Sequence, residues 1–363
     1  MKNTSLKILF LNRRDIKNPA GGGAEFYTHE AAKALVKKGH AVHILSSRFK
    51  GAPLEEIIDH IKYIRKGSEL TVHFHGFLHA LRSRKNFDLI IDEFNGLGFF
   101  TFPFSRSVLL IHQLYKEFWF RELGLPGLFP YMVEPVFLRR YRKRPAITVS
   151  ESTKEDLRAL GFGEARIHIV MNAIKGAPLT SVPVKEGVPT LIFLGRLRAT
   201  KRPEDAIKIY RRIKEKIPGA RLWIVGTGPE EDPLRRLAAG DPGITFFGWQ
   251  EDEKKLKLLG RAHVLLVPGV REGFGINVIE AASRGTPAIG YDVPGLRDSI
   301  KDGLTGFTAR GVEDASEKSI RLLEDKGLYS RMAAECLLYA GNFNWERRGE
   351  EFVQLIERLS GKH

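Results

Sequence analysis

Short runs of apolar residues alternate along the chain with longer stretches in which apolar residues recur every three or four positions. Short, non-alternating apolar runs are typical of strands covered on both faces of a parallel sheet, and the longer stretches predict helices. The predicted strands of the first half are Lys7–Asn12, Ala41–Ser47, Leu70–Phe74, Asp88–Asp92, Val108–His112, Ala146–Ser150 and Ile167–Met171. Those of the second half are Thr190–Gly195, Arg221–Val225, Ile244–Phe247, Val264–Val267 and Ala288–Tyr291. This pattern predicts two α/β units in tandem.

A boundary between the two series is indicated by a stretch with little periodicity that contains Pro178, Pro183 and Pro189. At 363 residues the chain also exceeds what a single core usually supports. We expect a first domain over 1–172, a linker over 173–189 and a second domain over 190–344. The stretch 345–363 predicts a packing helix, which is a candidate to return to the first domain.

Composition is that of a soluble globular enzyme, with 43% apolar and 28% charged residues and no low-complexity tract. Cys336 is the only cysteine, so no internal disulfide is possible and a reducing cytoplasm is the expected compartment. No window approaches the ~18 uninterrupted apolar residues of a membrane-spanning helix, so we do not expect the chain to cross a membrane.

The net charge of +15 is concentrated in residues 1–172, which hold 27 Lys and Arg against 17 Asp and Glu. A basic cluster follows the aromatic segment 118–137 and consists of Arg139, Arg140, Arg142, Lys143 and Arg144. Cations beside apolar and aromatic side chains are typical of a membrane-surface anchor. Nucleic acid is the competing partner, and a solvated helix end over a core-facing stripe is the third interpretation. We favour a cytoplasmic protein peripheral on the inner face of the membrane, with no nucleic-acid partner.

The segment 268–280 places two carboxylates, Glu272 and Glu280, at a predicted strand-to-helix turn. Gly273 and Gly275 permit a tight turn with accessible backbone N–H groups, beside which Glu272 could meet a donor sugar. Glu280 falls on the apolar side of the predicted helix 276–284, so its carboxylate needs a partner such as a pair of sugar or ribose hydroxyls. A capping glutamate and an ordinary salt bridge remain the alternatives.

Three further polar groups follow predicted strands, where ligands bind in open α/β sheets. Gly21, Gly22 and Gly23 precede a predicted helix, 26–38, whose N-terminus attracts phosphate. Arg196 and Lys201 would stabilise charge developing on a departing diphosphate without a metal. His112 could hydrogen-bond a sugar hydroxyl or handle a proton. A simple tight turn, solubilising surface cations and a structural histidine are the respective alternatives.

No metal cofactor is predicted. His73, His75 and His79 have no accompanying cysteine or acidic cluster, and Asp92 with Glu93 lacks a second carboxylate at matching spacing.

In sum, these residues resemble the GT4 family of retaining glycosyltransferases, which have the GT-B fold. The resemblance spans nearly the whole chain and includes Gly22 to Glu25, His112, Gly195 to Leu197 with Lys201, Glu272 to Gly275 with Glu280, and Trp345 to Arg347. It implies two Rossmann-like parallel-sheet domains facing an interdomain cleft, with the acceptor on the first domain and the nucleotide sugar on the second. It also implies metal-independent, retaining transfer from a UDP- or GDP-sugar to a hydroxyl of a lipid-linked or cell-surface glycan precursor.

The resemblance further implies a role for each site residue. Arg196 and Lys201 would bind the diphosphate, Glu280 the ribose, and Glu272 with the N–H groups of Gly273, Phe274 and Gly275 the donor sugar and distal phosphate. Gly22 and Gly23 would close over the diphosphate, and His112 would face the sugar near the reacting carbon. No protein nucleophile is nominated. Gln113, Gly269 and Ala173 depart from the common pattern of the family.

Two other functions remain as alternatives. A UDP-N-acetylglucosamine 2-epimerase shares this architecture but needs acidic catalytic residues in the first domain, where no matching set is found. A basic nucleic-acid-binding module is supported only by the net charge of +15.

Overall fold

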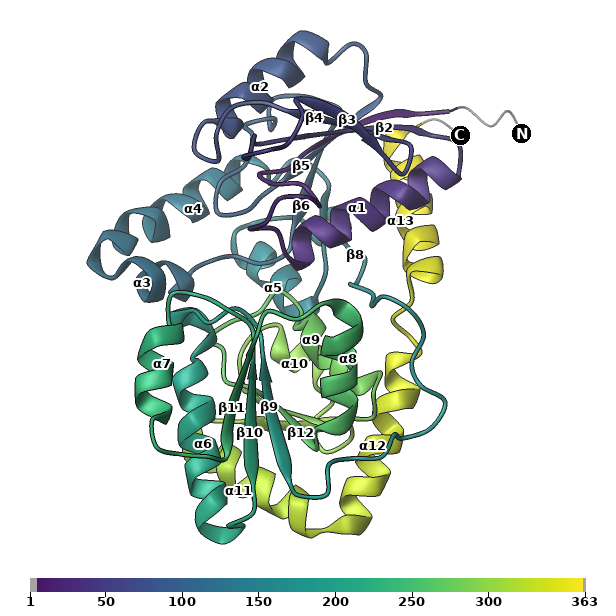
Figure 1. The fold of residues 1–363 in the computed structure, drawn as a ribbon. Coiled ribbons are helices and arrows are strands. Elements are labelled where there is room, and N and C mark those ends of the chain that lie inside the picture. Colours follow the sequence, from purple (N-terminus) through teal and green to yellow (C-terminus); the bar gives the residue numbers. More distant parts are fainter. Residues whose placement is uncertain (1–4, 362–363) are drawn as a thin grey trace. The chain divides into compact units, whose positions relative to one another are not determined.

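The computed structural model describes residues 5–361, which form two compact units (Figure 1). Unit 1 comprises Met1–Lys116, Leu128–Ala173 and Trp345–His363, and unit 2 comprises Glu117–Gly127 and Ile174–Asn344. Residues 1–4 and 362–363, which fall within the predicted first domain and last helix, lie outside the described residues. No helix in the described part of the chain combines the length and apolar character needed to span a bilayer.

Unit 1 is built on a sheet with the strand order β3-β4-β2-β1-β5-β6-β7-β8, parallel except where β3 pairs antiparallel with β4. Its strands are β1 Lys7–Leu11, β2 Ala41–Ser46, β3 Glu55–Ile58, β4 Ile61–Arg65, β5 Leu89–Glu93, β6 Ser107–Ile111, β7 Ala146–Thr148 and β8 Ile167–Ile169. Its helices are α1 Gly23–Lys37, α2 Val72–Ser83, α4 Leu128–Arg140, α5 Glu151–Ala159, the 3-10 turn η2 Glu164–Arg166 and α13 Trp345–Ser360.

The last helix, α13, packs against α1 inside unit 1 (Figure 1). The contact is close because Gly349 has no side chain: a Cβ there would lie 2.8 Å from the Cβ of Ala34. Farther along α13, Phe352 is fully buried and stacks on Phe10 of β1 with 6.3 Å between ring centroids. The helix is therefore held by core packing.

Unit 2 is built on an all-parallel sheet with the strand order β11-β10-β9-β12-β13-β14. Its strands are β9 Thr190–Leu194, β10 Arg221–Val225, β11 Ile244–Gly248, β12 Val264–Val267, β13 Ala288–Tyr291 and β14 Gly306–Ala309. Its helices are α3 Glu117–Leu123, α6 Pro203–Lys216, α7 Glu231–Ala238, α8 Asp252–Arg261, α9 Ile276–Ala282, α10 Leu296–Ser299, α11 Val312–Glu324 and α12 Lys326–Ala340, with 3-10 turns η1 Leu125–Gly127 and η3 Ala199–Lys201.

One predicted strand is wrong, because the run 70–74 enters helix α2. Short apolar runs do not distinguish strand from helix by themselves. Here Val72, Gly76 and Ala80 are buried at a spacing of four, so the apolar face continues one helical turn after another. Strands β3, β4 and β14 were not predicted.

Two segments lie elsewhere than the predicted domain boundaries place them. Residues 117–127 group with unit 2. The predicted linker, from Ile174 onward, also belongs to unit 2 and is hydrogen-bonded along it. Leu179 N donates to Ser283 O (3.0 Å), Glu186 N to Arg261 O (2.9 Å) and Lys185 Nζ to Thr286 Oγ1 (2.7 Å). These bonds hold against unit 2 the stretch that was predicted to be an interdomain linker.

Candidate active site

The loops after β9 and β12 bring Lys201 and Glu272 together in unit 2. These two strands are neighbours in the parallel sheet, so their carboxyl ends lie at the same edge. Lys201 Nζ donates to Glu272 Oε1, and Val270 N donates to Thr200 O at 3.0 Å, which joins the loops through side chains and backbone. The Glu272 side chain is only 12% exposed. Two groups predicted to hold different parts of a donor thus form one ion pair.

Glycines hold the backbone of the Glu272 loop in place. Glu272 N donates to Pro294 O at 3.1 Å. Gly295, which follows Pro294, has φ +84°. Its backbone lies so close to Glu272 that a Cβ on residue 295 would overlap the carbonyl of Glu272. Gly275, with φ +76°, is the N-cap residue of α9, and the buried ring of Phe274 packs on Phe343 with 5.5 Å between centroids. The side chain of Phe274 therefore belongs to the core, and only its backbone can serve a ligand.

Glu280 of α9 forms a salt bridge, which was one of the alternatives left open from the sequence, and its partner Lys255 was not predicted. Lys255 Nζ of α8 donates to Glu280 Oε1 at 2.8 Å, and both side chains are 18% exposed. Burial opposes the charge of Lys255, but the carboxylates of Glu280 and Asp252 raise its pKa above the usual value. The expected hydroxyl pair would share this carboxylate with Lys255. The two pairing residues are far apart in sequence, so no local pattern could have found the contact.

Arg196 lies half-buried in the loop after β9. This loop packs against the loop after β10 and is hydrogen-bonded to it. Leu197 N donates to Thr227 O at 3.0 Å, and a Cβ at Gly226 would overlap the carbonyl of Gly195. This close approach fixes the backbone on both sides of Arg196. A cation at a strand exit, on a braced loop, is suited to bind phosphate oxygens.

In unit 1, His112 follows β6 and lies beside Glu93, the last residue of the neighbouring strand β5. His112 Nε2 is 3.5 Å from Glu93 Oε1, and the edge-on ring of Tyr27 is 5.1 Å away. Glu93 is fully buried and accepts from Thr28 Oγ1 (2.6 Å) and Asn95 Nδ2 (3.3 Å). Sequence reasoning considered Glu93 only as a metal ligand. Glu93 ends a strand that neighbours β6, and this position in the sheet could have predicted that it lies near His112.

The predicted phosphate pocket at the start of α1 is partly occupied by the protein itself. Gly22 and Gly23 are exposed, but Gly22 N donates to Glu25 Oε2 at 2.7 Å. Burial, together with the nearby Glu93, raises the pKa of Glu25. One N–H expected to meet phosphate is therefore bound to a carboxylate, as in a capping box.

Protein donors bind both carboxylate oxygens of Asp92. It accepts from Phe99 N (2.9 Å), Thr101 Oγ1 (2.7 Å) and Tyr141 Oη (2.6 Å). Within residues 5–361, no three His, Cys, Asp or Glu side chains gather closely enough to hold a metal ion.

The basic cluster is not uniform. Arg139, Arg140, Arg142 and Lys143 are exposed. Arg144 instead donates to three backbone carbonyls, those of Phe102 (2.9 Å), Ser105 (3.3 Å) and Pro103 (3.4 Å). The predicted surface role of Arg144 is corrected, because its guanidinium secures this loop.

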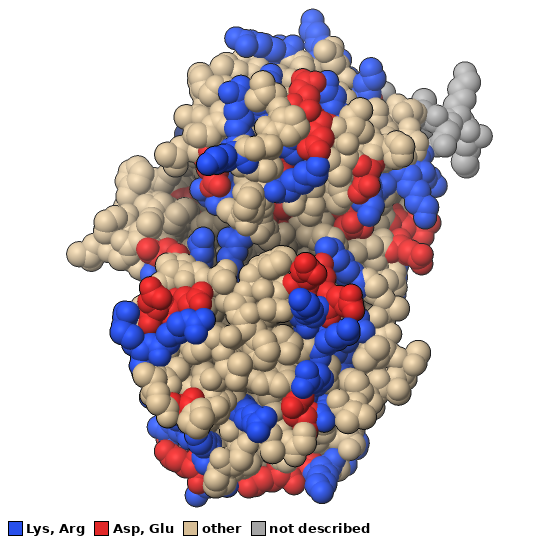
Figure 2. All heavy atoms as spheres, in the orientation of Figure 1, with Lys and Arg blue, Asp and Glu red and all other residues tan. Residues whose placement is uncertain are grey.

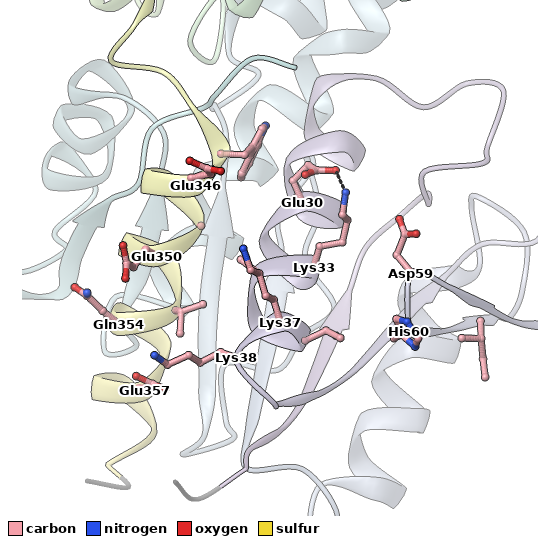
Figure 3. A pocket seen from close by; sticks show the side chains of 16 residues that line it. Glu30, Lys33, Lys37, Lys38, Asp59, His60, Glu346, Glu350, Gln354 and Glu357 are labelled. Atoms are coloured by element: carbon pink, nitrogen blue, oxygen red, sulfur yellow. Dashed lines mark hydrogen bonds and ion pairs between the residues drawn. The ribbon is translucent and has the colours of Figure 1, made fainter. Parts of the chain in front are cut away.

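A separate open pocket of about 990 Å³ lies in unit 1 between α1, α13 and the β3–β4 turn (Figure 3). Lys37 and Lys38 lie on one wall and Glu350 and Glu357 on the other. None of the predicted site residues lines it. Its volume therefore does not mark the site described above.

Two family models match the chain. "Glycosyl transferases group 1" matches residues 180–336 and "Glycosyltransferase Family 4" matches residues 21–175. Together the two matches cover most of both units.

Several curated proteins are similar over part of their length. A D-inositol 3-phosphate glycosyltransferase of Nocardia farcinica is 30% identical over 193 residues, which is 50% of this chain and 43% of that protein. A trehalose synthase of Pyrococcus horikoshii is 32% identical over 186 residues, 48% of this chain and 45% of that protein. The matched region thus spans about half the length of these relatives.

Solved structures share the fold. A sucrose-phosphate synthase from Thermosynechococcus elongatus superposes with a TM-score of 0.81 at 18% identity, covering 99% of this chain and 100% of that one. WaaG, a glycosyltransferase involved in lipopolysaccharide biosynthesis, gives 0.75 at 17% identity, covering 96% and 99%. The architecture of the two parallel-sheet units is that of GT-B glycosyltransferases.

Proposed function

Because the chain belongs to the group 1 and Family 4 glycosyltransferases, we propose that it transfers a sugar from a nucleoside diphosphate sugar to an acceptor hydroxyl. The observation that carries this proposal is the cluster at one edge of the unit 2 sheet. There the loop bearing Arg196 and Lys201 meets the loop bearing Glu272, and Glu280 follows on α9.

The proposed roles follow the chemistry of these groups. Arg196 and Lys201 bind the diphosphate and stabilise the charge that develops on it as the sugar departs. Glu280 accepts hydrogen bonds from the ribose. Glu272 and the backbone N–H groups of Gly273, Phe274 and Gly275 hold the donor sugar and distal phosphate. Because Arg196 and Lys201 would supply the positive charge at the leaving group, we propose that the reaction needs no metal.

Unit 1 is proposed to contribute Gly22 and Gly23 toward the diphosphate and His112 toward the sugar. The position of His112 supports this role, because its imidazole lies at the end of β6 with Nε2 3.5 Å from Oε1 of the buried Glu93. We further propose that the configuration at the sugar is retained, without a protein nucleophile.

The acceptor is proposed to be a lipid-linked or surface-glycan precursor met at an anionic membrane face. Support comes from α4, where Leu128, Phe129, Met132 and Val136 are 51%, 75%, 63% and 53% exposed. Glu134 and Leu138 take its buried positions, so this apolar stripe is not core-facing. On the face that Figure 2 shows, the projecting surface over the first part of α4 is largely uncharged. The exposed cations at Arg139 to Lys143 follow directly, as in helices that lie on membranes.

The test is to incubate the protein with UDP- and GDP-sugars and a panel of alcohol acceptors, with and without EDTA, and to follow nucleotide release and the anomer of the glycoside product by NMR. We expect release with at least one donor, unchanged by EDTA, and a product with the donor's configuration. Inversion or loss of activity in EDTA would contradict the mechanism. Neither the epimerase nor the nucleic-acid alternative gains a specific observation from the structure.

A further inference from the structure

Helix α3 belongs to unit 2, although the residues on either side of its segment, Lys116 and Leu128, belong to unit 1. The segment 117–127 is thus an insertion that packs on the donor side. It contacts the two loops that carry the candidate donor-binding groups.

The first contact is with the loop after β9. Thr200 Oγ1 donates to Glu122 Oε1 at 2.8 Å, and Arg198 Nη1 lies 3.8 Å from Glu122 Oε2. Thr200 is 1% exposed and immediately precedes Lys201. A buried hydroxyl that loses its partner costs free energy, so Glu122 fixes this turn.

The second contact is with the loop after β12. Arg271 Nε donates to Glu117 Oε2 at 3.0 Å. The Arg271 side chain is only 6% exposed, whereas that of Glu117 is 59% exposed. Because Arg271 immediately precedes Glu272, its side chain anchors the backbone from which the candidate sugar-binding carboxylate extends.

The contacts close into a ring. Glu122 holds Thr200, Lys201 pairs with Glu272, and Arg271 returns to Glu117 on the same helix. Inside the ring, the two loops are also joined by the bond from Val270 N to Thr200 O. Such a network fixes the relative position of its members more firmly than one contact would.

We propose that α3 is a positioning element for the donor site, and that Glu117 and Glu122 hold Lys201 and Glu272 at the separation that a nucleotide sugar requires. Neither glutamate need touch the substrate. This inference rests on the proposed function, because it assigns α3 to the same donor site.

The experiment compares the wild-type protein with the double variant Glu117→Gln/Glu122→Gln, using UDP, GDP and ADP as probes in calorimetric titrations. We expect at least about tenfold weaker nucleotide binding and faster amide hydrogen exchange in 196–201 and 269–275. Thr200→Val, which removes only the hydroxyl, should weaken binding by a smaller factor. The Glu122→Asp variant, which keeps the carboxylate, should restore part of the affinity that Glu122→Gln loses.

Glu313→Gln is the matched control, since Glu313 pairs with Arg212 at 2.9 Å on an exposed part of the same unit. The Glu313→Gln variant should match the wild type in nucleotide affinity and in amide hydrogen exchange. If the wild type binds a nucleotide, and the double variant and Thr200→Val both match it in affinity and exchange, α3 has no positioning role. If the wild type binds no nucleotide, the proposed function fails first.

Discussion

Charged residues of the candidate donor site neutralise one another in pairs: Lys201 with Glu272, and Lys255 with Glu280. A pair of half-buried ions is stable while both members are present, but removing one leaves the other poorly solvated. Lys201, Glu272 and Glu280 therefore each have a protein partner in addition to the role proposed for them toward the donor. Variants at this site are best judged by binding and turnover together with stability.

Arg196→Ala is expected to lower kcat about 10²–10³-fold with a smaller change in donor KM, because the cation acts mainly on charge that develops in the transition state. The measurement is steady-state nucleotide release. Arg212→Ala, which removes an exposed arginine of the same unit, is the control and should leave kcat unchanged. A normal kcat for Arg196→Ala would exclude the assigned role.

Lys185 gives a prediction for stability against pH. Burial lowers its pKa from 10.5 to about 7. Between these values the unfolded chain binds a proton that the folded chain lacks, so this lysine makes stability rise with pH, by up to about 1.4 kcal/mol per unit. Below about pH 7, Lys185 is charged in both the folded and the unfolded chain, so the full cost of burying its charge lowers the free energy of unfolding.

Lys185→Met should remove this dependence. In denaturant titrations from pH 7 to 9.5, the wild type should gain stability relative to the variant as pH rises. Lys257→Met, at a lysine whose side chain is 71% exposed, should show no such gain. Parallel curves for wild type and Lys185→Met would show that Lys185 keeps an ordinary pKa.

At the scale of elements, the turn before α10 controls the loop that carries Glu272. Gly295→Ala would force a Cβ into the carbonyl of Glu272, at a backbone φ of +84°. Gly303→Ala is a close match, because Gly303 has φ +75° and nothing within 4 Å of its Cβ position. Both variants bear the strain of a left-handed alanine, about 1 kcal/mol.

Only Gly295→Ala is expected to weaken nucleotide binding, by about tenfold or more, and to cost additional stability. The measurements are thermal unfolding and nucleotide titration. Equal losses in the two variants would mean that the close approach to Glu272 is unimportant.

The central strands were predictable because they are buried on both faces and read as continuous apolar runs, as in β1 and β12. Strand β3 was not predictable, because two charged residues, Glu55 and Glu56, begin it. It also lies at the edge of the sheet, where it pairs only with β4. The start of helix α2 was mistaken for a strand, because the short apolar run 70–74 overlaps the first turn of the helix. Local pattern fixes element type only when the run is long.

The positions of candidate site residues that follow a strand, such as Lys201 after β9 and His112 after β6, were predictable. The protein partners of the site residues were not predictable. Lys255, Glu117 and Glu122 reach the site through tertiary packing, which no local spacing in the sequence encodes. The GT-B fold was also correctly predicted. The roles assigned to the site residues stay predictions.

At the scale of the whole molecule, the exposed stripe of α4 and the cations after it predict association with membranes. Binding to anionic liposomes should fall with rising salt and be reduced in Arg139→Ser/Arg140→Ser/Arg142→Ser/Lys143→Ser, since each cation contributes about 1 kcal/mol near an anionic surface. Phe129→Ser/Met132→Ser should weaken binding at every salt concentration. Cosedimentation measures both effects.

Leu338→Ser is the control for the apolar substitutions, because Leu338 is 70% exposed but lies on α12 of unit 2. It should bind liposomes like the wild type. Unchanged binding after neutralising the four cations would remove the electrostatic part of this proposal.

Binding of nucleoside diphosphates to wild type and Glu280→Ala tests the donor site most directly. We predict that UDP, GDP or ADP binds the wild type and stabilises it as RT ln(1 + [L]/Kd), and that Glu280→Ala weakens binding at least about tenfold. Glu253→Ala, which removes an exposed glutamate of α8, should bind normally. The proposed donor site is wrong if none of the three binds, or if Glu280→Ala binds as tightly as the wild type.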